Sequence, residues 1–479
     1  MAGPPPTTPS PNLTMADVQA VINGAVTSAN VPMVVAVSDR GGNLLGLYKK
    51  ANAPAQGLGN FSQMVDSREL ALALARTASY FSNDQAPLSS RTVRFISGIH
   101  FPPGIQNVPN AALYGIENTN RGCPLNVTFA QPINPSRTID GTSTGLGIIT
   151  GKVDVFDSDP NAVNPGGVPL FKNGRLVGGV GVVAADPNVA EFAAFNASVA
   201  AGLGASPAPP GVVVIDGINL PFVKNTSRPA GYNAGTADGS YDVAAKDSSG
   251  PPPEGYLVNP ANGPMGGLTA AEVTSIVDKA IATANIERAV IRLPIGQRAK
   301  FAIAIADLDG SIIALNRMPD ATIFSIDVAV AKARNLVYFS SQSVDPQDLP
   351  GVPPGTAVTN RTISFGAQPL FPPGIDGSSA GPFFELYKYD TAHPCTNGHQ
   401  TTNLANQSGI VFFPGSVPLY KNGKLVGALG ISGDGVEQDD YDSAQAYVGF
   451  EPATNIMADQ ISIGGVRLPY LKFPRNPTF

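Results

Sequence analysis

The stretch VPLFKNGRLVGGVG (residues 168–181) returns in the second half of the chain as VPLYKNGKLVGALG (residues 417–430). Each copy places Lys-Asn-Gly between two apolar runs, which is the pattern of a β-hairpin with a tight turn. A repeat this long indicates that one supersecondary unit is present twice. We therefore expect two similar domains.

Helical segments and a second hairpin also recur. LTMADVQAVINGAVTSAN (13–30) matches LTAAEVTSIVDKAIATAN (268–285), and both have the i, i+3, i+4 apolar spacing of a helix with one buried face. MVVAVSDRGGNLLGLYK (33–49) matches FAIAIADLDGSIIALNR (301–317), each read as a buried strand, a turn and a second strand. Asp39 and Asp307, at equivalent strand ends, are expected to organise these turns.

The remaining matches complete the layout of each half. A second helix is expected at about 64–82 and about 324–341, and FPPGI occurs at equivalent places within 91–107 and 361–377. The order helix, hairpin, helix, irregular loop, hairpin, helix predicts an α+β fold with an antiparallel sheet flanked by helices in each half.

The domain boundaries follow from composition. Residues 1–12 are rich in proline and are expected to be disordered or extended, and residues 13–226 form the first domain. The Pro/Gly-rich stretch 227–266 is predicted to be a linker, and residues 267–479 form the second domain. We expect a covalent pseudo-dimer about an approximate two-fold axis.

Composition excludes two classes of partner. The net charge is −6 without basic runs, which argues against nucleic acid, because phosphates are neutralised by clustered Lys and Arg. No apolar run reaches the length that spans a bilayer. Low lysine content and abundant proline and glycine favour a secreted or periplasmic protein, although no signal peptide is visible and a cytoplasmic location stays open.

The two cysteines, Cys123 and Cys395, lie just upstream of their copies of the repeated hairpin. Two interpretations stay open. They are free thiols, or they form one disulfide that ties the halves together, which requires an exported protein.

Four segments follow one another in the second half: LTAAEVTSIVDKAIATAN, AIAIADLDGSIIALNRM, SIDVAVAKARNLVYF and SVPLYKNGKLVGALGISGDGVEQDD. In this order they resemble the heme-binding GlcG/HbpS family. The first half matches less closely, with Leu74 where Lys332 stands and VVAADPNVAEF where the second half has ISGDGVEQDD. Insertions at about 83–165 and 342–415 exceed a minimal family domain.

This resemblance implies self-association and binding of heme or a related tetrapyrrole, for carriage, storage or sensing rather than turnover. The alternative is a cofactor-free structural or assembly protein built from the duplicated domain. An enzyme with an active site between the halves, using Lys332 and neighbouring acids, is a third hypothesis.

Histidines are the first candidates for binding heme iron. His100 precedes an aromatic residue in GIHFPPG, and His393 and His399 flank Cys395 in HPCTNGH. His100 and His399 are also the candidate metal ligands. The alternative for all three is an ordinary loop histidine, because a structural zinc site needs about four ligands. Tyr114, Tyr387 and Tyr389 are further candidates or packing residues.

Lys332 and Arg334 lie on a helix otherwise lined by Val and Ala. Their charges could pair a propionate of a ligand, or Lys332 could extend along the helix to solvent. The acids of SGDGVEQDD (432–440) are interpreted as decorating a helix N-terminus.

Overall fold

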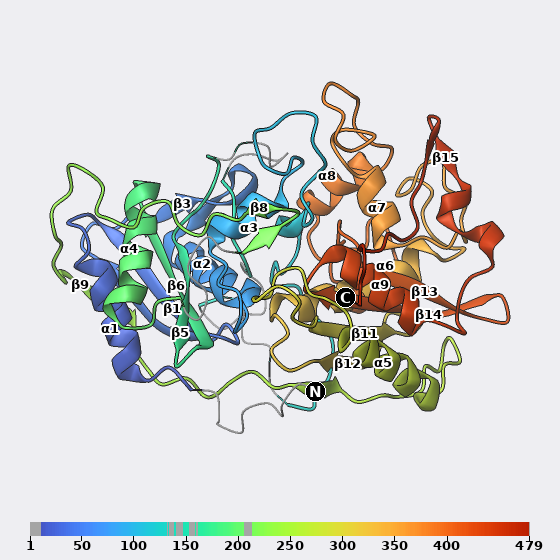
Figure 1. Cartoon of the computed structure of the whole chain (residues 1–479), viewed down its shortest axis with the longest axis horizontal. Helices are drawn as coiled ribbons and strands as arrows, with labels where there is room; N and C mark the ends of the chain where they lie inside the picture. The colour runs from blue at the N-terminus through green and yellow to red at the C-terminus, as the bar shows by residue number, and fades with distance from the viewer. Residues whose placement is uncertain are drawn as a thin grey trace.

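The computed structural model describes residues 11–131, 133, 138–139, 147–152, 159, 161–205 and 213–478. The N-terminal segment 1–12 lies almost wholly outside these residues. Two five-stranded sheets lie side by side, with the first half on the left and the second half on the right of Figure 1. Their strand orders correspond, β5-β6-β1-β2-β9 in one and β13-β14-β11-β12-β10 in the other. The predicted α+β class, with two similar antiparallel-sheet domains, is confirmed.

The repeated hairpins form the edge and the second strand of each sheet. Asn173 and Gly174 adopt φ of 52° and 73°, and Asn422 and Gly423 repeat these values, so each Asn-Gly pair makes the left-handed turn that a two-residue hairpin requires. The strands of the first sheet are β1 (Met33–Asp39), β2 (Leu44–Lys50), β5 (Gly167–Lys172), β6 (Arg175–Ala184) and β9 (Gly239–Val243). Those of the second are β10 (Gly255–Val258), β11 (Phe301–Ala306), β12 (Ile312–Arg317), β13 (Ser416–Lys421) and β14 (Lys424–Gly433).

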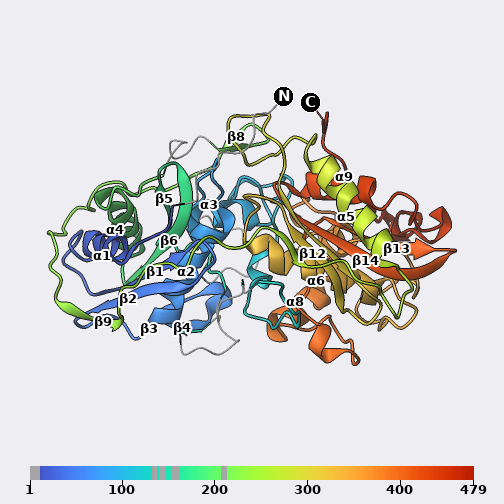
Figure 2. The same ribbon diagram turned by 90° about the horizontal axis from the view of Figure 1, so that it is seen from below.

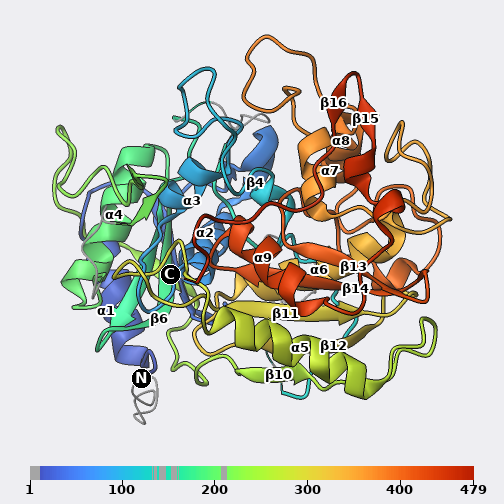
Figure 3. The same cartoon turned by 45° about the vertical axis from the view of Figure 1, so that its right-hand side comes forward.

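Helices cover both faces of each sheet. A pair of helices packs on the outer face, α1 (Met15–Val26) with α4 (Pro187–Ala200) in the first half and α5 (Ala270–Ala284) with α9 (Val436–Ala446) in the second (Figures 2 and 3). The opposite faces carry α2 (Ser67–Phe81) and α6 (Phe324–Phe339). Thr14 and Thr269 begin α1 and α5 with capping boxes, which satisfy backbone N–H groups of the first turn.

One apolar core is continuous between the halves. It joins the C-terminal end of α2 to α6, where the rings of Phe81 and Phe324 stack with centroids 4.1 Å apart. Two further clusters lie beneath the outer helix pairs, one in each half. The halves therefore share buried surface.

The structure has more secondary structure than expected in the irregular segments and in the stretch 227–266. The segments expected to be irregular contain α3 (Ser90–Ser97), α7 (Asn360–Gly366) and α8 (Phe384–Ala392), and α3 and α7 begin with capping boxes at Ser89 and Thr359. The stretch 227–266, expected as a linker, supplies β9 to one sheet and β10 to the other. Neither strand has an apolar alternation of its own, because each forms by pairing with an edge that is already in place.

The long insertions of the two halves meet. Cys123 and Cys395 form a disulfide, and beside it Arg121 Nη2 lies 2.8 Å from the Asp390 carboxylate. The two FPPGI loops also touch, since the Asn107 amide donates to Asp376. Each half ends in a short hairpin, β7 (Val214–Ile215) with β8 (Ile218–Asn219) and β15 (Ser462–Ile463) with β16 (Val466–Arg467). Among the described residues, every helix is too short or too polar to cross a bilayer.

Candidate functional site

A cleft between the two halves has two adjacent lobes. We call the lobe of about 760 Å³ the phenylalanine lobe and the lobe of about 1000 Å³ the tyrosine lobe. Their shared wall comes from the β7–β8 turn of the first half and from α9 and the C-terminal tail of the second, including Ile215, Asp216, Val436, Glu437, Lys472 and Phe473. Both volumes fall within the range of small-molecule and cofactor pockets.

The phenylalanine lobe combines an apolar interior with cations. Phe81 and Phe324 form a stacked pair on its wall, and Phe413 lies on the same lobe. The cationic residues Lys472 and Arg475 are exposed and border the lobe, and the Lys472 ammonium pairs with Glu437 on the same wall. Such a site suits a ligand with a flat apolar body and anionic substituents.

Lys332 lies beneath this lobe and is fully buried. Its Nζ donates to Asp439 Oδ2 at 2.9 Å and to the Ile431 carbonyl at 2.7 Å, and it lies 5.0 Å from the centre of the Phe413 ring. The ammonium therefore pairs with a carboxylate of the chain itself. Burial lowers the pKa of Lys332 and raises the pKa of Asp439 to about 7.

Two more buried carboxyl groups lie near Asp439. Glu287 follows α5, and Asp442 is on α9; neither has a hydrogen-bond partner for either oxygen, and both are fully buried. Burial, followed by repulsion from Asp442 and Asp439, raises the pKa of Glu287 to about 10. Burial and then Asp439 raise the pKa of Asp442. Glu287 is therefore a neutral acid at pH 7, and the ionised form of Asp442 is disfavoured by the same burial.

A charged side chain whose contact is repeated in both halves has a role in the fold, and Arg334 is one of these. Arg334 Nε donates to the Gly310 carbonyl at 2.9 Å, and Arg76 repeats this contact on Gly42 at 2.9 Å. Since both halves use an arginine to hold the turn of the first hairpin, the structure gives Arg334 a role in the fold. The contact places its guanidinium away from the residues that line the cleft.

A second ion pair is also common to both halves. Arg361 Nε binds Asp440, and Arg91 Nε binds Glu191 at the equivalent place. Each acid also accepts from a backbone amide of its C-terminal tail, Lys472 N at 3.0 Å and Lys224 N at 3.1 Å. These pairs fix α7 and α3 to the tails and belong to the fold.

Lys332 and its neighbours have no such counterparts. Strand pairing aligns Ala184 with Gly433, and six residues later Ala190 stands where the second half has Asp439. Leu74 occupies the place of Lys332, because it precedes Arg76 as Lys332 precedes Arg334. The first half therefore folds with apolar residues where the second half buries a Lys–Asp pair.

His100 lies apart from the cleft. Its Nε2 is 2.8 Å from the Asp376 carboxylate of the other half, and it borders a separate hollow of about 440 Å³ with Leu370, the residue equivalent to it. His100 lines neither lobe.

His393 and His399 lie near the disulfide, and both imidazole rings pack against the Tyr389 ring. The Tyr389 ring is 4.1 Å from His393 and 3.8 Å from His399, and His399 Nδ1 binds Asp348 at 2.6 Å. The structure therefore does not bring His100 and His399 to one place. Within the described part of the chain, no group of three or more His, Cys, Asp or Glu side chains is placed to hold a metal ion.

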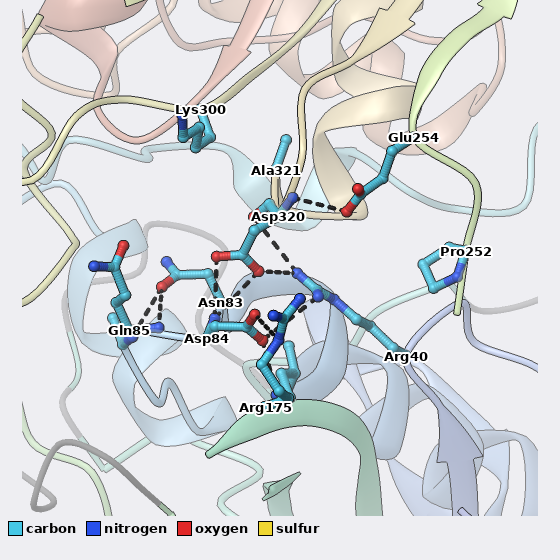
Figure 4. Close-up of polar contacts among 12 residues, drawn as sticks. Arg40, Asn83, Asp84, Gln85, Arg175, Pro252, Glu254, Lys300, Asp320 and Ala321 are labelled. Carbon is cyan, nitrogen blue, oxygen red and sulfur yellow. Dashed lines mark hydrogen bonds and ion pairs between the residues drawn. The ribbon is translucent and has the colours of Figure 1, made fainter. Parts of the chain in front are cut away.

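The two halves are also joined by a network of charges centred on Asp320. Its carboxylate binds Arg40 of the first half, and Arg40 Nη1 is 3.6 Å from Asp84 (Figure 4). The same carboxylate lies 2.5 Å from Arg292 Nη1. Burial alone would raise the pKa of Asp320, but Arg40 and Arg292 outweigh it and hold that pKa below its usual value. This network clamps the halves beside the cleft, because Arg292 also binds Asp434, just before α9.

Sequence reasoning missed the partner of Lys332. The acids after residue 432 do decorate the first turn of α9, as expected, but Asp439 turns inward to Lys332 and also lines the phenylalanine lobe. The aligned halves show Leu74 at the position of Lys332. They also show Ala190 at the position of Asp439, and this joint loss of a cation and an anion is the signal that could have identified Asp439 as the partner of Lys332. Glu287 gave no signal in the sequence.

Comparison with known proteins supports the predicted family for the second half. Residues 268–447 match the family model described as haem degrading protein HbpS-like. An uncharacterized 15.0 kDa protein in the dhaT-dhaS intergenic region of Citrobacter freundii is 56% identical over 36 residues, which are 8% of this chain and 25% of that protein. The chain thus matches about a quarter of the length of that curated relative. The second half is a GlcG/HbpS-like domain.

Three solved structures are similar to this chain. Klebsiella pneumoniae ORFY is 21% identical, with a TM-score of 0.24, and the match covers 37% of this chain and 86% of ORFY. A PduOC:heme complex is 22% identical, with a TM-score of 0.25, over 38% and 95% of the two chains. A double mutant of Streptomyces reticuli HbpS is 16% identical, with a TM-score of 0.22, over 38% and 84%.

Proposed function

We propose that the cleft binds heme or a related tetrapyrrole for carriage, storage or sensing. The phenylalanine lobe carries this proposal: its volume of about 760 Å³, the stacked Phe81 and Phe324, and Lys472 at its border suit a flat macrocycle with carboxylate substituents. The family description of residues 268–447, which names haem, agrees with it.

The residues present fit the macrocycle better than the iron. No histidine, cysteine or methionine is among the described residues that line either lobe; the candidate iron ligands there are tyrosines, Tyr114, Tyr447 and Tyr470. Burial, and then Glu451, raise the pKa of Tyr447 to about 12, which opposes the phenolate that iron prefers. A bound tetrapyrrole would supply a planar chromophore; the chain would hold it by its faces and its carboxylates. His100, His393 and His399 stay predictions as iron ligands.

Titration with hemin, followed by its Soret absorption, tests the proposal. Lys472→Ala is expected to weaken binding several-fold, because Lys472 lies on both lobes. Lys224→Ala, at the equivalent exposed position of the first half, is the matched control and should bind as the wild type does. Equal loss in both variants, or loss in His100→Ala alone, would contradict binding in the cleft.

A second candidate is a cofactor-free assembly protein. Ile105 and Ile375 occupy the same place in the two FPPGI loops and are 51% and 53% exposed. Because the two loops contact each other through Asn107 and Asp376, these isoleucines are the surface that this candidate would use to contact another subunit. A colourless protein whose oligomers dissociate on replacing both isoleucines with serine would support this candidate over tetrapyrrole binding.

We also propose an exported pseudo-dimer. The disulfide between Cys123 and Cys395 supports export, because such bonds persist in oxidising compartments. The matching strand orders support descent of the halves from a symmetric dimer. Labelling of thiols in freshly lysed producing cells, with and without reductant, checks the first part.

A further inference from the structure

The N-terminus of α9 opens on the phenylalanine lobe. Gly433, Gly435 and Val436 line the lobe, and no side chain caps the helix. In the first half, Asp186 occupies the position of Gly435 and caps α4 by accepting from the Asn188 amide at 2.9 Å. The uncapped N–H groups of a helix start favour an anion. The backbone N–H groups at the start of α9 are therefore without the side-chain carboxylate that Asp186 provides at the start of α4.

Asp439 supplies a second polar group on the same wall. Lys332 holds its Oδ2, while its Oδ1 has no hydrogen-bond partner although the residue is only 2% exposed. A buried oxygen without a partner is unfavourable unless something that is bound there completes it. Ala190 at the equivalent place shows that the fold does not require this carboxyl group.

Several charged groups set the protonation of Asp439. Lys332 faces it from α6, Asp440 and Asp442 from α9, and Glu287 from the segment after α5; Asp434 also acts on it. Glu437, Gln438 and Arg288 line the lobe around it, and Glu437 is itself paired with Lys472. Burial dominates and raises the pKa of Asp439 to about 7, so this carboxyl titrates near neutral pH.

We propose that a carboxylate of the ligand docks at the N-terminus of α9 and accepts a hydrogen bond from protonated Asp439 Oδ1. This inference rests on the proposed tetrapyrrole function and adds the group by which the ligand is oriented. Molecules whose Asp439 is ionised take up one proton from solvent when they bind, and the proton stays on Asp439. Uptake of ligand and proton is thus linked.

The sign of the linkage follows from the bound state. A ligand carboxylate favours the protonated acid, so the pKa of Asp439 rises on binding. Affinity is then full below pH 7 and falls as the pH rises, by roughly tenfold between pH 6 and pH 8. The ligand's own carboxylates, with ordinary pKa values near 4 to 5, stay ionised throughout this range.

Metal-free protoporphyrin IX and its dimethyl ester, titrated at pH 6 and pH 8 by fluorescence, test the proposal. The free acid should bind wild-type protein roughly tenfold more weakly at pH 8, and the ester, which has no carboxylate, should show no such difference. Asp439→Asn keeps a hydrogen-bond donor at every pH, so its affinity for the free acid should not change with pH.

The Lys332→Leu/Asp439→Ala double variant, which has the residues of the first half, should bind weakly at both pH values. Circular dichroism checks that this double variant is folded. It provides a second test if Asp439→Asn does not fold. A pH-independent wild type, an equal response of the ester, or a retained response in Asp439→Asn overturns the docking of the carboxylate while leaving tetrapyrrole binding in place. Failure of both porphyrins to bind at either pH overturns both proposals.

Discussion

The Lys332–Asp439 pair should stabilise the fold far less than its burial suggests. Lys332→Leu leaves a buried carboxylate without its cation, and Asp439→Ala leaves a buried ammonium without its anion; each should cost about 3 kcal/mol at pH 8. The double variant has the residues of the first half, Leu74 and Ala190, both of which are buried there. We expect it to lie within about 1.5 kcal/mol of wild type, which gives a coupling energy of at least about 4.5 kcal/mol.

Urea unfolding of the four proteins, with the disulfide intact and followed by circular dichroism, measures these differences from the transition midpoints. The control is Arg361→Leu/Asp440→Ala, which removes a pair that both halves keep; it should remain clearly destabilised because the Lys472 amide also loses its acceptor. A double variant at Lys332 and Asp439 that costs the sum of its single changes would refute the reasoning, since the pair would then be part of the fold.

Three further changes test other parts of the structure. Glu287→Gln should gain stability over wild type as the pH rises from 6 to 9 in thermal unfolding, because the raised pKa makes the native protein hold a proton that the unfolded chain releases. Asp320→Ala should cost about 3–5 kcal/mol in urea, against under about 1 kcal/mol for exposed Glu385→Ala; this loss should begin to shrink as the pH falls below about 4 and disappear only below the lowered pKa of the native carboxyl. Reducing the bond between Cys123 and Cys395, 272 residues apart, should lower the free energy of unfolding by about 4–5 kcal/mol; an unchanged midpoint would contradict its role in joining the halves.

The elements that could be predicted from the sequence are those specified by local patterns. The hairpin at 168–181 carries its own turn residues, and α1 and α5 carry both an apolar stripe and a capping box, so their places follow from short-range chemistry. Strands β9 and β10 could not be found in this way. Gly239–Val243 is almost wholly exposed, and it becomes a strand because β2 offers it unpaired backbone groups.

The candidate site was harder to predict, because it depends on tertiary placement. Lys332 was identified from the family resemblance, but its partner lies 107 residues away, and the helix period alone does not say that Asp439 turns inward. Glu287 looks like a solvated acid in the sequence and becomes a neutral buried one only through packing against α9. The histidines were chosen for their chemistry, and the fold places them outside the cleft lining.

The cleft between the halves is the proposed binding site for a macrocycle, and it is the part of the structure to test first. The most direct measurement is a fluorescence titration of the disulfide-bonded protein with metal-free protoporphyrin IX, with the stoichiometry read from the break point. We predict one porphyrin per chain, with an affinity within about tenfold of that for hemin, because the lobe holds the ring without an iron ligand from histidine. Binding of hemin alone, abolished in a variant without His100, would contradict the account.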